Sequence, residues 1–135
     1  MPSRSHRGFS LVEIMIVVVI IGLMAGVVTF ATARYLEKSK QTKAKSDIAT
    51  LAGAVESFYM ERGDYPDNRQ GLAVLAPDFV KVVPNDPWGE PYVYVVPGEV
   101  QPFDIMSYGA DGREGGEGRD ADVRFETMHE DVEAR

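Results

Sequence analysis

An uninterrupted apolar stretch near the N-terminus constrains this chain more than any other feature. From Ile14 to Ala33 there are twenty consecutive residues without a charged side chain. As an α-helix this stretch would be about 30 Å long, which is the thickness of the hydrocarbon core of a bilayer. No small-residue cleavage site of the secretory kind follows it convincingly, so the stretch predicts a single membrane anchor rather than a removed signal peptide.

The rest of the composition limits what the remaining chain can be. Of the 135 residues, about 100 are left for one domain with a modest core. The formal net charge of −7 argues against nucleic acid as a partner, because phosphate binding needs a basic surface. The chain has no cysteine, so it has no disulfide and no thiolate ligand or nucleophile. Outside the cytoplasm, another device such as a metal ion would have to hold its loops.

The charges that flank the apolar stretch leave its orientation open. Two arginines precede it, Arg4 and Arg7, and five basic residues follow it, at Arg34, Lys38, Lys40, Lys43 and Lys45. A count of basic residues near the ends would place the C-terminal side in the cytoplasm. That expectation conflicts with the periplasmic placement implied by the family resemblance described below. The role of the cluster Lys38–Lys45 also stays open between lipid head groups and acidic surface on neighbouring copies.

A six-residue motif stands between the basic leader and the apolar stretch. Gly8 to Glu13 reads G-F-S-L-V-E. A carboxylate at the end of a membrane span can reach the interface, so one interpretation of Glu13 is a tolerated interfacial residue. The whole motif, however, resembles the class III signal of type IV pilins and pseudopilins. The resemblance implies that a prepilin peptidase cuts between Gly8 and Phe9 and methylates the new N-terminus at Phe9.

Cleavage would give Glu13 a partner. The new amine of Phe9 and the carboxylate of Glu13 are four residues apart and share one helix face. Opposite charges in a low-dielectric environment each need a partner. The resemblance implies that Glu13 of one subunit meets the amine of Phe9 on a neighbour and so sets the register of a filament. Pairing of Glu13 with its own Phe9 amine remains an alternative.

The segment after the apolar stretch predicts a continuation of the same helix. From Tyr35 to Arg62 there is no proline, and Gly63 is a plausible helix stop. Its apolar positions recur at helical spacing, most clearly at Ile48, Leu51, Val55 and Phe58. We therefore expect one helix from Phe9 to Arg62, about 80 Å long, whose second half is covered by a small domain.

The C-terminal half predicts a small antiparallel sheet. A short helix or turn is expected over 71–79, and the prolines at Pro84, Pro87 and Pro91 interrupt regular structure before Tyr92. Segments rich in β-branched and aromatic residues predict strands at 92–96, 103–108 and 122–125. The fold class expected is therefore α+β, with a long N-terminal α-helix and a small antiparallel β-sheet head. This arrangement resembles the type IV pilin-like fold.

The block Asp86–Tyr94 reads D-P-W-G-E-P-Y-V-Y and resembles a block of the major pseudopilins of type II secretion systems, the general secretion pathway protein G group. Trp88 could serve as a ligand platform. The prolines on both sides of it favour a core anchor instead.

An acidic, glycine-rich segment follows, from Asp104 to Asp122. It holds six acidic residues with five interleaved glycines. Glycines permit sharp turns, so carboxylates and backbone carbonyls can converge as the six to eight oxygens that Ca²⁺ requires. The segment lacks the EF-hand pattern, and its composition alone fits a solvated acidic loop equally well.

The same segment resembles the C-terminal block of the major pseudopilins, in which a calcium ion holds the loop. The resemblance implies Asp111 as the first carboxylate ligand and Asp120 and Asp122 as further ones. It also implies carbonyl ligands near Tyr108 and Gly116. Some family members have an acid or amide where this chain has Gly118, which leaves the second carboxylate open.

These features predict five segments. They are a cleaved leader over 1–8, a transmembrane and assembly helix over 9–34, its amphipathic continuation over 35–63, a globular head over 64–125 and a polar tail over 126–135. His129 in the tail is interpreted as a surface residue. We expect a structural protein rather than an enzyme.

The resemblance implies a subunit of the periplasmic pseudopilus of a type II secretion system. Such a subunit is anchored once in the bacterial inner membrane with its C-terminal domain in the periplasm. Its implied partners are further copies of itself in a helical filament, the prepilin peptidase, minor pseudopilins, the inner-membrane secretion platform and membrane lipid. The alternatives are a type IV pilin of a surface fibre and a membrane-anchored, metal-dependent hydrolase that uses Asp111, Asp120 and Asp122.

Overall fold

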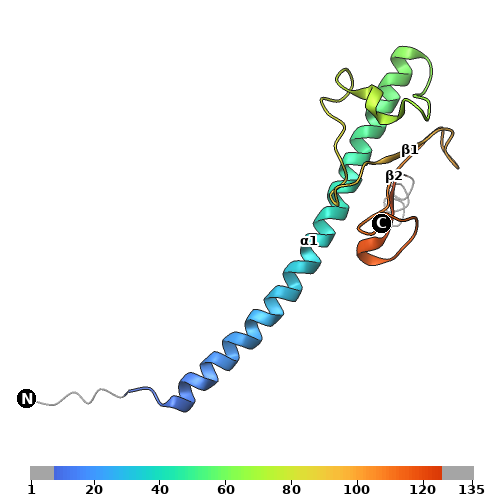
Figure 1. Cartoon of the computed structure of the whole chain (residues 1–135). Helices are drawn as coiled ribbons and strands as arrows, with labels where there is room; N and C mark the ends of the chain where they lie inside the picture. Colours follow the sequence, from blue (N-terminus) through green and yellow to red (C-terminus); the bar gives the residue numbers. More distant parts are fainter. Residues whose placement is uncertain (1–7, 126–135) are drawn as a thin grey trace, which may run out of the picture. The chain divides into compact units, whose positions relative to one another are not determined.

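The computed structural model describes residues 8–125, and Figure 1 shows its elements in chain order. They are the helix α1 (Leu11–Arg62), the 3₁₀ helix η1 (Gly71–Leu75), the strands β1 (Val93–Val95) and β2 (Asp104–Ser107), the 3₁₀ helix η2 (Gly118–Asp120) and the strand β3 (Val123–Arg124). Contacts divide the chain between Leu36 and Glu37 into an N-terminal unit and a C-terminal unit. The leader before Gly8, and the polar tail with His129, lie outside the described residues.

The predicted long helix is confirmed, with one correction at its start. Helix α1 contains 52 residues and begins at Leu11 rather than at Phe9. Ser10 ends the non-helical segment because its hydroxyl oxygen accepts the N–H of Glu13 at 3.2 Å. Its carbonyl oxygen accepts the N–H of Ile14 at 3.3 Å. These bonds give the first turn of the helix the acceptors that an N-cap supplies.

The C-terminal end of α1 agrees with its sequence signals. Gly63 has a φ of +86°, a left-handed conformation that favours glycine, and its N–H bonds the carbonyl of Tyr59 at 2.8 Å. All four residues of the predicted apolar stripe are buried, namely Ile48, Leu51, Val55 and Phe58. The second half of α1 is therefore part of the core of the C-terminal unit.

The sheet is antiparallel with the strand order β1-β2-β3. Tyr94 pairs with Ile105, and Ser107 pairs with Val123. All three strands are shorter than predicted. Strand β1 ends at Val95 because both backbone groups of Val96 bond the side chain of Asn68, at 2.8 Å and 2.6 Å, instead of a strand.

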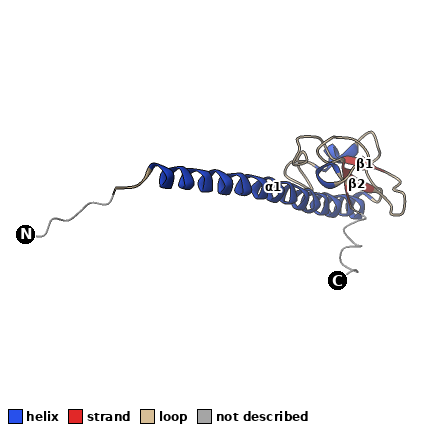
Figure 2. Cartoon of the chain, turned by 90° about the horizontal axis from the view of Figure 1, so that it is seen from below, coloured by secondary structure: helices blue, strands red, loops and turns tan. Residues whose placement is uncertain are grey.

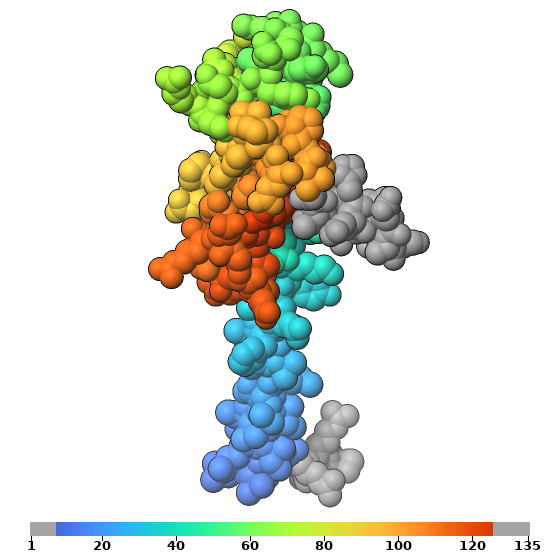
Figure 3. Space-filling view, turned by 90° about the vertical axis from the view of Figure 1, so that its right-hand side faces the viewer, coloured from blue at the N-terminus to red at the C-terminus, as the bar shows by residue number. Residues whose placement is uncertain are grey.

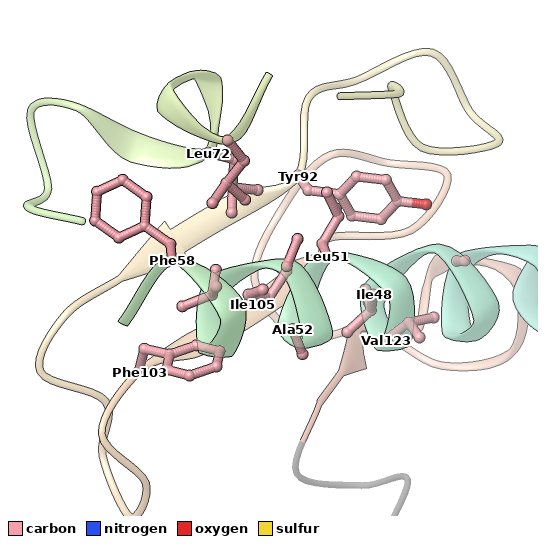
Figure 4. Close-up of a cluster of buried hydrophobic side chains, with 13 residues drawn as sticks. Ile48, Leu51, Ala52, Phe58, Leu72, Tyr92, Phe103, Ile105 and Val123 are labelled. Atoms are coloured by element: carbon pink, nitrogen blue, oxygen red, sulfur yellow. The ribbon is translucent and has the colours of Figure 1, made fainter. Parts of the chain in front are cut away.

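The core of the C-terminal unit lies between α1 and the segments after it. Figure 4 shows the side chains of Ile48, Leu51 and Phe58 from α1 together with Leu72 from η1 and Ile105 from β2. Ile48 and Ile105 are completely buried. The predicted α+β class is confirmed, and Figure 2 shows that loops rather than strands make up most of the chain after α1.

Candidate functional sites

The peptide bond between Gly8 and Phe9 lies before the first helical residue. Neither residue has regular secondary structure, and the side chain of Phe9 is 79% exposed. A Cβ atom built on Gly8 would meet nothing within 4 Å. The bond that a prepilin peptidase would cut is therefore outside the helix and accessible within the described residues.

Ser10 has a structural role that the sequence interpretation missed. Its hydroxyl caps α1 through the N–H of Glu13. Ser10 and Glu13 also have the S-x-x-E spacing of a capping box, which is the signal that could have revealed the cap. Glu13 lies in the first helical turn, where the helix dipole favours a negative charge. The motif Gly8–Glu13 therefore contains a helix start as well as the predicted cleavage signal.

The apolar part of α1 has no cover within the N-terminal unit. Its large apolar side chains are between 47% exposed, for Val17, and 81% exposed, for Leu11. By length and composition, α1 is the one helix among the described residues that could cross a membrane, with a mean hydropathy of 2.9 over its best window. Such a surface needs lipid or the same surface on other subunits to exclude water.

The acidic loop folds back on the backbone of Asp120. Gly109 and Gly116 have φ values of +69° and +94°. A Cβ atom on either would lie only 2.8 Å or 2.6 Å from the carbonyl oxygen of Asp120. Both positions therefore need glycine for conformation and for space. The side-chain amide of Gln41 in α1 also donates to the carbonyl of Gly118 at 2.6 Å, a contact that the sequence did not predict.

Asp122 is the acidic side chain most enclosed by this loop. Its side chain is 11% exposed, and its Oδ2 atom accepts the N–H of Gly115 at 3.0 Å and an N–H of Arg124 at 3.3 Å. Its Oδ1 atom is buried and has no hydrogen-bond partner within the described part of the chain. A buried carboxylate oxygen without a donor is costly unless another positive group meets it.

The other predicted ligands are placed differently. Asp111 is exposed, and its Oδ1 atom accepts the N–H of Arg113 at 3.1 Å. The Oδ1 atom of Asp120 lies 3.5 Å from the guanidinium of Arg119. Tyr108 is half-buried, and Gly116 lies against Asp120. Over residues 8–125, no three acidic or histidine side chains lie close enough together to hold a metal ion. The structure thus brings the backbone of the loop together but does not gather Asp111, Asp120 and Asp122 into one cluster of three carboxylates.

Asp86 organises the D-P-W-G turn and was also missed. Its side chain is 5% exposed. Its Oδ1 atom accepts the N–H groups of Trp88 and Glu90 at 3.1 Å and 2.9 Å. Its Oδ2 atom accepts the hydroxyl of the fully buried Ser107 at 2.5 Å. An aspartate that starts a turn and bonds the backbone two residues on is the signal that could have indicated this role.

Trp88 packs against the hydrophobic core, as predicted for a core anchor, but it remains partly exposed. Its Nε1–H group donates to Oε1 of Glu37 at 3.0 Å. The contact ties the turn to the first residue of the C-terminal unit. Trp88 is therefore an anchor with a polar contact rather than a wholly buried core residue.

Two tyrosines of the C-terminal unit are held in the neutral state. Burial raises the pKa of Tyr94 to about 12. Burial, followed by the hydrogen bond to Asp47, raises the pKa of Tyr92 far above its usual value. The hydroxyl of Tyr92 donates to Oδ2 of Asp47 at 2.9 Å, and that of Tyr94 donates to the carbonyl of Pro66 at 3.0 Å.

These pKa values predict that the C-terminal unit loses stability in alkali. In the unfolded chain, tyrosine loses its proton near pH 10, whereas the folded chain keeps it there. The tyrosine contribution is therefore fully present below pH 10 and is lost as the pH rises towards 12. Thermal melts between pH 7 and 12 measure the effect. The decline above pH 10 should be shallower in Tyr94→Phe, and an unchanged decline would contradict the assignment.

Comparison with known proteins completes these observations. Residues 31–126 match the family model "Type II secretion system (T2SS), protein G", and residues 3–29 match the prokaryotic N-terminal methylation motif. The type II secretion system core protein G of Pseudomonas aeruginosa is 39% identical, with 91% of this chain and 96% of that protein covered. The corresponding Vibrio cholerae protein is 38% identical, with coverage of 89% and 91%.

A solved structure is also similar. The crystal structure of the major pseudopilin from the type 2 secretion system of enterohaemorrhagic Escherichia coli has a TM-score of 0.59 to this chain at 27% sequence identity. The match covers 69% of this chain and 91% of that chain.

The long helix, the small antiparallel sheet and the N-terminal methylation motif define a type IV pilin-like protein. Within that class, the chain belongs to the type II secretion system protein G family. The predicted family is thereby confirmed. The similarity to a major pseudopilin favours this interpretation over a pilin of a surface fibre.

Proposed function

We propose that this chain is the main structural subunit of a type II secretion pseudopilus. In this proposal a prepilin peptidase cuts between Gly8 and Phe9, and the methylated mature chain is drawn from the inner membrane into a helical filament. Growth of the filament would drive export across the outer membrane. The observation that carries the proposal is the exposed apolar half of α1, most of which lies within the matched methylation motif over residues 3–29.

The apolar surface of α1 can be covered by lipid before assembly and by neighbouring subunits after assembly. An apolar helix of this length fits a bilayer before assembly, and it can pack against identical helices afterwards. The Glu13 carboxylate would pair with the Phe9 amine of a neighbouring copy after assembly. The C-terminal unit would then lie in the periplasm, with minor pseudopilins and the inner-membrane platform as partners. The positive-inside count argues against this orientation, so a periplasmic label on the C-terminal unit is a direct check.

Deletion of the gene that encodes this chain in its host tests the function. Substrates of the secretion system should then accumulate in the periplasm, and the intact chain supplied in trans should restore their release. If release continued while long surface fibres disappeared, the surface-pilin alternative would replace the proposal.

We also propose that Ca²⁺ stabilises the acidic loop. The donor set fits a hard cation that binds oxygen, because the buried Oδ1 atom of Asp122 lacks a partner among the described residues. Gly109 and Gly116 both lie against the backbone carbonyl of Asp120, two residues before Asp122. Asp122 would be the principal carboxylate ligand. Asp111, Asp120 and carbonyls near Tyr108 and Gly116 remain proposed ligands.

Calcium removal should therefore lower the melting temperature of the protein. At a free calcium concentration near 100 times the dissociation constant, the loss would be on the order of 10 °C. Asp122→Asn should abolish the calcium-dependent part of the shift. Asp67→Asn, an exposed aspartate outside the loop, should retain it. Equal melting temperatures with calcium and with a chelator would favour a solvated loop instead.

A further inference from the structure

An open groove lies on the C-terminal unit, away from the acidic loop. It has a volume of about 410 Å³ and is lined by Asp47, Thr50 and Leu51 of α1 and by residues of the segment 79–84. Leu51 is 1% exposed and belongs to the hydrophobic core, whereas Val82 is 70% exposed. The groove therefore offers apolar surface that is open to solvent in the single chain. Lys81 contributes a positive charge to its lining.

A second exposed valine stands on a tight turn elsewhere in the same unit. We call residues 98–102, between β1 and β2, the Val100 turn. Val100 is 77% exposed. The turn is fixed by two bonds, from the N–H of Glu99 to Oδ2 of Asp104 at 2.8 Å and from the N–H of Gly98 to the carbonyl of Pro102 at 3.2 Å. Val100 is thus presented on a hydrogen-bonded turn, next to the exposed carboxylate of Glu99.

The two features are complementary in polarity and charge. The other charged residue of the groove lining, Asp47, is already paired with Lys43 at 2.6 Å, so Lys81 supplies the charge that the groove offers beside its apolar lining. The turn pairs the exposed Val100 with the exposed Glu99. In the view of Figure 1 the segment that lines the groove is drawn to the left of α1 and the turn between β1 and β2 to its right. Figure 3 shows the region of the turn, in orange, on the face directed at the viewer. Two different patches that fit each other give a heterologous contact, which repeats from copy to copy as an open helix.

We propose that the Val100 turn of one copy docks in the groove of the next copy. Val100 covers the open apolar lining, and Glu99 faces Lys81. The proposal rests on the proposed assembly of this chain into a filament, and it adds a contact between C-terminal units to the packing of the apolar helices. It predicts that the C-terminal units repeat in one fixed orientation along the filament.

The absence of cysteine in the chain permits a sharp test. Thr50→Cys and Val100→Cys are placed in two separately tagged full-length chains that are expressed together with the secretion system. Each chain then has one thiol, so no disulfide can form within a single copy. We expect mixed dimers that carry both tags. Met60→Cys is the control partner for Val100→Cys, because Met60 is 82% exposed but lies outside the groove lining.

A charge reversal tests the same contact without cross-links. Lys81→Glu and Glu99→Lys should each lower the yield of filaments, and the double reversal should restore it. Filaments that form without the Thr50–Val100 mixed dimer would overturn the docking contact alone. Equal cross-linking to Met60→Cys, or cross-linking of Thr50→Cys to a different protein, would also overturn it. Absence of any filament from the unaltered chain would instead count against the proposed function.

Discussion

Replacement of Glu13 by alanine should leave the chain inserted in the membrane but abolish filament assembly. The α-helix should still start normally, because Ser10 is bonded to the backbone N–H of Glu13 and not to its carboxylate. Insertion should not suffer, since the change removes a charge from the end of an apolar segment. In the filament, however, the amine of Phe9 would lose its partner. Loss of one member of a buried charge pair costs about 3–5 kcal/mol per pair.

Membrane fractionation and electron microscopy of sheared cells measure the two outcomes separately. Glu13→Gln keeps the size of the side chain and removes only its charge, so it should fail to assemble as Glu13→Ala does. Glu13→Asp keeps the charge and should retain part of the assembly. Normal filaments from Glu13→Gln would show that the carboxylate has no role in register.

Replacement of Asp86 by alanine should give the largest loss of stability in the C-terminal unit. The change removes the acceptor of three hydrogen bonds, from Trp88, Glu90 and Ser107. Hydrogen bonds to a charged group are worth about 1.5–3 kcal/mol each, and the hydroxyl of Ser107 would be left buried without this acceptor. A loss of about 3 kcal/mol or more is a large part of the stability of a small domain.

Asp67→Ala provides the matched control. Asp67 also accepts two backbone N–H groups, from Arg69 and Gln70, but it is exposed, so its removal should cost about 1 kcal/mol or less. Urea unfolding of the full chain in detergent, followed through the single tryptophan, measures both variants. Equal losses for Asp86→Ala and Asp67→Ala would contradict the structural role of Asp86.

The elements that depend on local pattern could be predicted from the sequence. The helix follows from a long charge-free stretch joined to the stripe Ile48, Leu51, Val55 and Phe58, and it ends at Gly63 as expected. The strand segments were located correctly but were predicted too long. Side chains such as Asn68 take over the backbone groups of Val96, and a long-range contact of this kind leaves no periodic signal.

The candidate sites likewise divide into residues that a local motif reveals and residues whose role depends on long-range contacts. Gly8, Phe9 and Glu13 were predicted because a compact motif carries them, and the family match supports that motif. Two of the three bonds of Asp86 are local and carry a turn signal, whereas its bond to Ser107, which is 21 residues away, leaves no signal in the sequence. The calcium ligands were predicted from composition and resemblance. Only the arrangement in space distinguishes the enclosed Asp122 from the exposed Asp111.

The central claim is that this chain is processed into a subunit whose N-terminus takes part in assembly. Mass spectrometry of the chain recovered from its host tests that claim most directly. The account predicts a mature protein that begins at Phe9 and carries a methyl group on its amine. A chain that retains Met1, or one cut after the apolar stretch near Ala33, would contradict it.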